Sequence, residues 1–174
     1  MKNKYYEMTV PVFTKMLENL DHLLSKGAAY AVEKGINEET LLGNRLAPDM
    51  FPLSRQIQIA TDNAKGAVAR LCGIEAPIMD DTETTVTELH ERIAKTLTFI
   101  GSLTEDQFAD AESRHIFIKW YPGQHFTADS YVSEYAIPNF FFHTTIAYAL
   151  LRVMGAEVGK QDYLGQLTLQ DDKN

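Results

Sequence analysis

The side chains best suited to proton transfer or metal binding in this sequence are its five histidines. Imidazole titrates near neutral pH and is also the commonest nitrogen ligand for metal ions in proteins. The five are His22, His90, His115, His125 and His143. At 100° per residue, His22 points away from the apolar side of its predicted helix, whereas His143 lies about 60° from the centre of an apolar stripe. Asn139 lies one turn before His143, so we predict that both side chains project toward the interior of a helical bundle.

Gln56 is the residue of an earlier helix that best fits opposite this pair, because it lies about 70° from the centre of that helix's apolar stripe. Buried polar groups cost free energy unless they are hydrogen-bonded, and bundle cores are common places for ligand sites. Two interpretations follow: Gln56, Asn139 and His143 bind a small polar molecule, or they form a satisfied core network. If the protein is an enzyme, His143 is the expected proton-transfer group. No serine–histidine–acid or cysteine–histidine pattern accompanies it.

Four segments with helical spacing are expected to position these residues. They span residues 11–34, 49–73, 86–101 and 130–154. Thr9 is the expected N-cap of the first segment, and Thr85 with Glu88 forms a capping box before the third. The apolar stripe of the last segment is expected at Tyr135, Asn139, Phe142, Ile146, Ala149/Leu150 and Val153. Pro138 should kink this helix or mark a second start.

Residues 114–128 depart from the helical pattern. Ile116, Ile118 and Trp120 alternate with other side chains in the period of a strand, and Pro122-Gly123 supplies a turn. We therefore predict an all-α fold, a four-helix bundle with a small β-hairpin inserted between helices three and four.

Length and composition limit the function classes. The chain has 174 residues, 45% of them apolar, which suits a single domain over residues 1–174. Its net charge of −8 argues against a nucleic acid as the main partner. The single cysteine, Cys72, excludes an internal disulfide. No apolar run is long enough to span a membrane and the first residues do not resemble a signal peptide, so a cytoplasmic protein is expected.

Three aromatic side chains of the last helix lie off its expected core stripe: Phe140, Phe141 and Tyr148. A monomeric bundle would expose them unless the hairpin or the C-terminal tail covers them. We favour the third possibility, a homodimer in which a second subunit covers them.

Several stretches of the sequence resemble an uncharacterised family of the DinB-like superfamily. They are residues 45–53 (RLAPDMFPL), 60–66 (ATDNAKG), 81–89 (DTETTVTEL), 138–143 (PNFFFH), 147–152 (AYALLR) and 159–165 (GKQDYLG). The resemblance covers nearly the whole chain. It implies a four-helix bundle that is often dimeric. Many superfamily members hold a divalent metal ion with three histidines, one from the second helix and two from an H-x-x-x-H pair on the fourth.

Only one of these three ligands has a counterpart in this sequence. His143 matches the second histidine of the pair, Asn139 stands at the position of the first, and residues 49–72 contain no histidine. We therefore predict a degenerate metal site that holds no metal cofactor and binds a small polar molecule at Gln56, Asn139 and His143. One alternative is a non-catalytic dimeric module. Another is a divalent-metal-dependent hydrolase or thiol-transferase-like enzyme that recruits His90 or a hairpin histidine.

Overall fold

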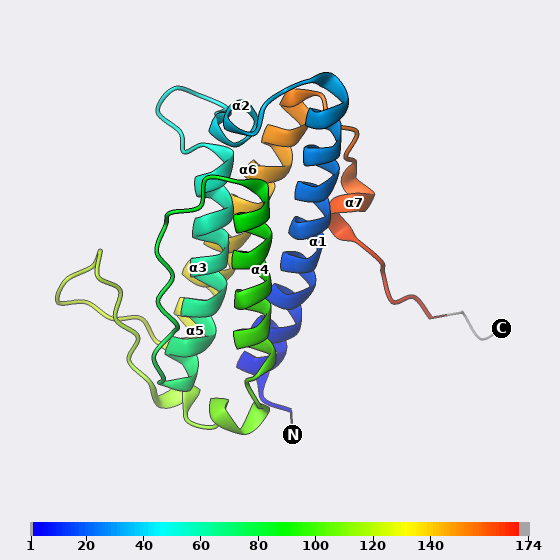
Figure 1. Ribbon diagram of the computed structural model, residues 1–174. Helices are drawn as coiled ribbons and strands as arrows, with labels where there is room; N and C mark the ends of the chain where they lie inside the picture. Colours follow the sequence, from blue (N-terminus) through cyan, green and yellow to red (C-terminus); the bar gives the residue numbers. More distant parts are fainter. Residues whose placement is uncertain (1, 171–174) are drawn as a thin grey trace.

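Four long helices lie side by side in the computed structural model, which describes residues 2–170 (Figure 1). They are α1 (Lys4–Lys34), α3 (Leu53–Cys72), α4 (Val86–Gly101) and α6 (Ile137–Met154). Shorter helical elements join them: α2 (Glu38–Gly43), η1 (Glu105–Phe108), η2 (Ala111–Ser113), α5 (Ala128–Ser130) and α7 (Lys160–Leu164). A π-helical segment, η3 (Tyr131–Ala136), leads directly into α6. The predicted predominantly helical fold is confirmed.

Most predicted helix ends are present, but the start of α1 differs from the prediction, and α3 begins at Leu53 rather than near residue 49. The Thr85–Glu88 capping box forms at the start of α4. Gly35 and Gly155 adopt left-handed backbone conformations immediately after α1 and α6, which only glycine does without strain. However, α1 begins at Lys4 and Asn3 caps it, so the prediction of Thr9 as the N-cap is wrong. The hydroxyl of Thr9 instead donates to the Tyr5 carbonyl (2.6 Å) within the helix.

The core face of α6 differs from the predicted stripe. The buried residues of this helix are Phe140, His143, Thr144, Ala147, Leu150 and Leu151. Phe142, expected in the core, is 53% exposed, whereas Phe140 is fully buried. Because α6 carries apolar residues on every side, their positions alone do not determine which side faces the bundle.

The predicted β-hairpin is replaced by a loop, and among residues 2–170 no β-strand forms. The two arms of the loop meet in one antiparallel bridge, Ile116–Phe126, with two backbone hydrogen bonds of 2.9 Å. Two turns lie between the arms, with hydrogen bonds from Tyr121 N to Ile118 O and from Gln124 N to Tyr121 O. These bonds use backbone groups that a longer β-ladder would need. The loop projects from the bundle at the lower left of Figure 1. It is anchored by aromatic contacts, because Tyr121 and Phe126 both pack against Tyr135 of η3.

The C-terminal segment covers part of the outer side of α6. Tyr163 of α7 packs edge-on against Tyr148 with ring centroids 5.7 Å apart. Its hydroxyl lies within hydrogen-bonding distance of the hydroxyls of Thr144 and Thr145. Asp162 holds α7 on α1 through Lys26 (2.9 Å) and His22 (3.3 Å). The tail therefore covers Tyr148, one of the three aromatics for which a covering element was expected.

No helix in residues 2–170 has the length and apolar content that a bilayer span requires.

Candidate functional site

His143 and Gln56 meet in the seam between α6 and α3. His143 Nδ1 lies 2.7 Å from Gln56 Oε1, and both side chains are buried. The amide nitrogen of Gln56 donates to the carbonyl oxygen of Phe51 (3.0 Å). This second bond fixes the orientation of the Gln56 amide, so Oε1 must accept a hydrogen bond from the Nδ1–H of His143. The two side chains that the sequence predicts to face each other are therefore in direct contact.

The hydrogen bond to Gln56 also determines what the other ring nitrogen of His143 can do. Burial, with the positive charge of Arg55, lowers the pKa of His143 from 6.5 to about 4. The imidazole is therefore neutral at pH 7, with its proton on Nδ1 and a lone pair on Nε2. The ring is 8% exposed, and among the described residues no group hydrogen-bonds to Nε2. Nε2 is thus a fixed acceptor at the edge of the core.

Asn139 lies one turn before His143 on α6 but is not part of this hydrogen-bond pair. Its side chain is partly exposed, whereas the prediction placed it on the core stripe. Pro138 occupies the first turn of α6 directly after the π-helical segment. Asn139 is therefore more exposed than His143, and the structure does not bring its amide into the hydrogen-bonded pair.

Three residues near His143 were not predicted from the sequence pattern. Arg55 precedes Gln56 on α3, and its charge contributes to the low pKa of His143. The exposed ring of Phe142 lies edge-on to His143, with centroids 5.1 Å apart. Phe51 is also exposed, and its ring lies under the Arg55 guanidinium at 5.9 Å. A neutral acceptor with an aromatic ring beside it therefore lies near a second pair, the Arg55 guanidinium and the Phe51 ring, and the same guanidinium is also paired with Asp81.

The side chains present do not fit a metal ion held by three strong nitrogen ligands. His143 Nε2 is one imidazole donor, but the Gln56 amide is already used on both sides, and an amide oxygen such as that of Asn139 binds transition metals poorly. The other histidines are engaged elsewhere: His90 Nδ1 lies 2.5 Å from Asp21 Oδ1, and His115 stacks on His125. Within the described part of the chain, no three His, Cys, Asp or Glu side chains converge as a metal-ligand set.

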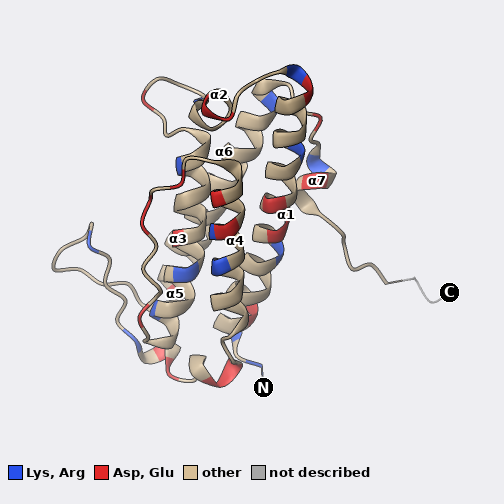
Figure 2. Cartoon of the chain, viewed as in Figure 1, with Lys and Arg blue, Asp and Glu red and all other residues tan. Residues whose placement is uncertain are grey.

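A second polar cluster surrounds a buried arginine, and Arg55 is linked to it through its ion pair with Asp81. Arg92 of α4 donates to Asp62 (2.6 Å), Glu83 (2.9 Å) and the Thr61 hydroxyl (2.8 Å). Burial alone would lower the pKa of Arg92, but the hydrogen bond to Glu83 and the nearby carboxylates outweigh burial and raise it. Most of the acidic side chains of this cluster come from the segment between α3 and α4, where Figure 2 shows acidic residues in red. This cluster fastens that segment to the bundle and has no free donor directed at a ligand.

The same cluster changes the interpretation of Lys65. The spacing of Asp62 and Lys65 suggests a solvated surface pair, and the two are indeed 2.9 Å apart. However, Lys65 is buried and also donates to the Pro77 carbonyl (3.0 Å). Lys65 is therefore a second anchor for the segment after α3.

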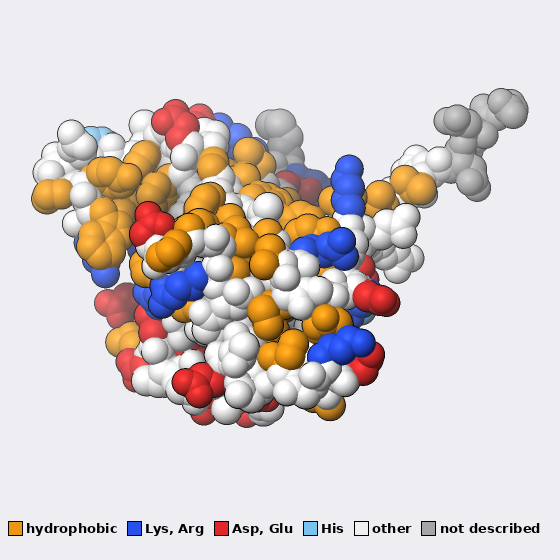
Figure 3. Space-filling model, turned by 90° about the horizontal axis from the view of Figure 1, so that it is seen from above, with side chains coloured by type: hydrophobic (Ala, Val, Ile, Leu, Met, Phe, Trp, Pro, Cys, Tyr) orange, Lys and Arg blue, Asp and Glu red, His pale blue; other side chains and the backbone are white. Residues whose placement is uncertain are grey.

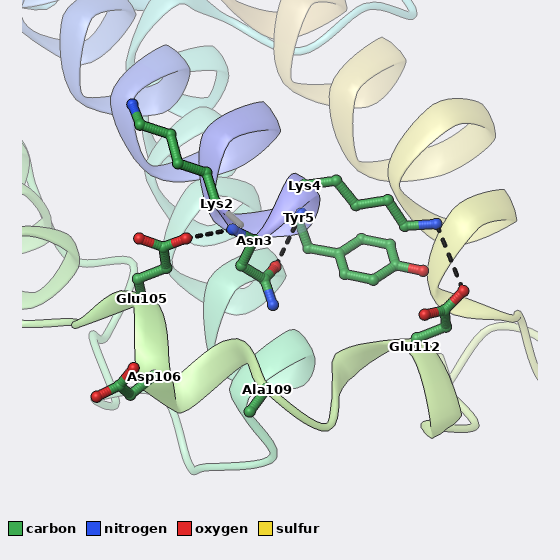
Figure 4. Close-up of a pocket in the computed structure, with 8 residues that line it drawn as sticks. All are labelled: Lys2, Asn3, Lys4, Tyr5, Glu105, Asp106, Ala109 and Glu112. Carbon is green, nitrogen blue, oxygen red and sulfur yellow. Dashed lines mark hydrogen bonds and ion pairs between the residues drawn. The ribbon is translucent and has the colours of Figure 1, made fainter.

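Two surface hollows lie away from His143. One is formed by side chains of α4, Glu91, Ala94, Lys95 and Thr98. The other lies where the N-terminus meets η1 and η2 (Figure 4). In the second hollow, Lys4 pairs with Asp129 (2.9 Å) and Glu112 (3.7 Å), and Asn3 is bonded to Glu105. Lys4 and Glu105 are thus already engaged by neighbouring groups. From above, hydrophobic and charged side chains are interspersed over the end of the bundle, with no single charged patch (Figure 3).

Comparisons with known proteins agree with this architecture. Residues 5–164 match the domain of unknown function DUF1993. The structure superimposes on the crystal structure of a DinB family member from Shewanella denitrificans with a TM-score of 0.92. The two sequences are 45% identical, over 95% of this chain and 94% of that one. No curated protein matches the chain. The chain therefore belongs to the DUF1993 family, an uncharacterised DinB-like family.

Proposed function

We propose that this protein binds a small polar molecule at the α3–α6 seam, where His143 Nε2 accepts a hydrogen bond from it. The observation that carries the proposal is the fixed tautomer of His143. Gln56 accepts a hydrogen bond from Nδ1–H, so Nε2 carries a lone pair and has no partner among the described residues. A hydrogen-bond acceptor with a fixed direction selects a ligand that carries an N–H or O–H group.

The neighbouring side chains define the rest of the ligand. Arg55 has a fixed positive charge and more donors than its contacts with Gln58 and Asp81 use. A carboxylate is the group that a guanidinium binds most specifically. The rings of Phe51 and Phe142 offer apolar contact beside it. The best-fitting ligand is therefore a small carboxylic acid with a hydroxyl or amino group.

The low pKa of His143 favours binding over proton transfer. A general base is most effective when its pKa lies near the working pH. At a pKa of about 4 the imidazole accepts hydrogen bonds well at pH 7 but takes up a full proton weakly. The sequence-based expectation that His143 would transfer a proton relied on a pKa near neutrality.

A thermal-shift titration with lactate, glycine and 3-hydroxybutyrate tests the proposal. At least one of these acids should raise the unfolding temperature, because a ligand that binds only the folded state adds about 2.7 kcal/mol at 100 times its Kd. The rise should disappear in His143→Gln and shrink in Arg55→Gln. His22→Gln, at an exposed histidine on α1, is the matched control and should keep it. An equal rise in wild type and His143→Gln, or no rise with any of the acids, would refute the proposal.

A second candidate, a module without a ligand, is favoured by the closed hydrogen-bond chain from His143 through Gln56 to the Phe51 carbonyl. If that chain has only a structural role, leucines at both Gln56 and His143 should preserve or raise the stability, since apolar replacement of both partners of a buried polar pair is often neutral or favourable. If the chain serves a binding site, the same double variant should fold but lose the response to the acids.

A further inference from the structure

The loop at residues 114–127 displays large aromatic side chains to solvent. Three of them are exposed: Phe117 (64%), Trp120 (69%) and Tyr121 (42%). The aliphatic residues among them turn the other way, since Ile116 and Ile118 are buried and belong to the core of the bundle. The loop thus buries its aliphatic side chains and leaves its aromatic ones outside. An exposed apolar patch is the usual mark of a contact with a protein or a membrane.

Contacts within the loop and with the bundle hold these rings in place. The ring of Phe117 lies 5.6 Å from that of His125, which stacks on His115 at 4.0 Å. Tyr121 packs edge-on against Tyr135 of η3, with ring centroids 6.3 Å apart. The aromatic side chains are therefore presented on an ordered surface, and binding them costs less conformational entropy than binding a flexible segment would.

The loop also differs in charge from the rest of the chain. All 24 acidic residues lie outside residues 113–128, and Figure 2 shows no red on the projecting loop. Lys119 is exposed near the tip of the loop. The acidic residues at its two ends, Glu112 and Asp129, both pair with Lys4 at the N-terminus of the bundle. A chain with a net charge of −8 therefore displays its aromatic patch together with a positive charge.

We propose that this loop docks on the surface of a phospholipid bilayer that contains anionic lipid. Tryptophan and tyrosine concentrate at the interface between membrane and water, because each ring combines an apolar body with a polar tip. The ammonium group of Lys119 lies 4.3 Å from the ring of Trp120, so it can reach the lipid phosphates while the ring enters the headgroup layer. Such a contact needs no membrane-spanning helix, and none occurs in residues 2–170.

A bilayer fits this surface better than the other partners that bind exposed aromatic rings. A single-stranded nucleic acid stacks on such rings but also needs a positively charged groove along its backbone. Lys119 is the only lysine or arginine among residues 115–128. A protein partner would need a concave pocket for a loop that projects from the bundle (Figure 1), whereas a lipid surface deforms around it. The bilayer is therefore the partner that the shape and charge of the loop favour.

Vesicle flotation with the full chain tests the proposal. The protein should float with vesicles of phosphatidylcholine and phosphatidylserine in equal parts, and more weakly with phosphatidylcholine alone. Trp120→Ala should weaken binding to both at least about tenfold, which is equivalent to removing about 55 Å² of apolar surface from the contact. Lys119→Gln should weaken binding about fivefold, and only with the vesicles that contain phosphatidylserine, since one lysine near an anionic surface contributes about 1 kcal/mol.

Two exposed residues elsewhere supply matched controls. Ile78→Ala removes a 93% exposed apolar side chain between α3 and α4, and Lys95→Gln removes an exposed cation of α4. Both should bind as the wild type does, and circular dichroism should show that all four variants are folded. Failure to float with either vesicle, or flotation unchanged in Trp120→Ala, would overturn the proposal. Binding abolished by Lys119→Gln would also overturn it, because the contact would then depend on charge alone. His143 takes no part in these measurements, so the proposed ligand site can fail while the membrane contact stands.

Discussion

Replacing Arg92 by methionine is expected to lower the free energy of unfolding by about 3–5 kcal/mol, the largest effect of any single substitution proposed for this chain. The guanidinium of Arg92 is buried and contacts three carboxylates, those of Asp62, Asp81 and Glu83. Methionine fills a similar volume but leaves these charges without their main partner. Urea unfolding followed by circular dichroism measures the change as a lower midpoint.

Two further variants identify the cause of that loss. Lys95→Met removes an exposed cation on the same helix, 3.9 Å from Glu91, and should change the stability by less than about 1 kcal/mol. Adding Asp62→Asn to Arg92→Met should recover part of the lost stability, because it removes one of the uncompensated charges. A loss below about 1 kcal/mol in Arg92→Met would show that water screens the cluster and that its burial contributes little.

Protonation of His143 should be coupled to folding over the acid range. Its folded-state pKa of about 4 lies below the unfolded value of 6.5, so the unfolded chain binds the proton first as the pH falls. The stabilisation is fully present above pH 6.5 and is lost progressively down to pH 4. The shift corresponds to about 3 kcal/mol of unfolding free energy.

Comparison with His143→Gln isolates this contribution from that of the carboxylates. The wild type should lose more stability than His143→Gln between pH 7 and pH 4.5, and the difference between the two urea midpoints should shrink as the pH falls. NMR titration of the imidazole Cε1–H should give the low pKa directly. Parallel pH profiles for the two proteins would mean that His143 titrates with its ordinary pKa and is solvated.

Most helix ends can be predicted from local sequence rules. The Thr85–Glu88 box and the glycines after the long helices act within one helical turn, so their effect can be derived from neighbouring residues alone. The start of α1 is misplaced because Thr9 and Asn3 are both residue types that cap helices, and the prediction takes the later one. The N-cap lies six residues earlier than predicted, at Asn3, and the helix contains Pro11 in its interior.

Which side of α6 faces the bundle core could not be derived in the same way. Apolar residues surround this helix, and two different seams fit a helical period. The choice between them depends on what lies opposite, namely the alanine-rich face of α3. The contact between Gln56 and His143 was nevertheless predicted. Both residues lie near the boundary of their apolar stripes, so they still point toward each other when the predicted core side of α6 is wrong by one residue.

The Arg92 cluster could not be predicted from the sequence for a different reason. Its members are up to 31 positions apart and come from α3, α4 and the segment between them. Asp62 and Lys65 looked like a surface pair because nothing local indicates that residues 74–84 fold back over them. The environment of Arg55 was missed for the same reason, since its nearness to His143 depends on how α3 and α6 pack.

The loop that replaces the predicted hairpin determines what can be observed by fluorescence. The only tryptophan of the chain, Trp120, is 69% exposed on this loop, next to the ammonium group of Lys119. Its emission should already be red-shifted in the native state and should change little when the bundle unfolds. Intrinsic fluorescence would then monitor the loop alone, so a spectral change without a change in circular dichroism would indicate an event at residues 114–127 rather than loss of the fold.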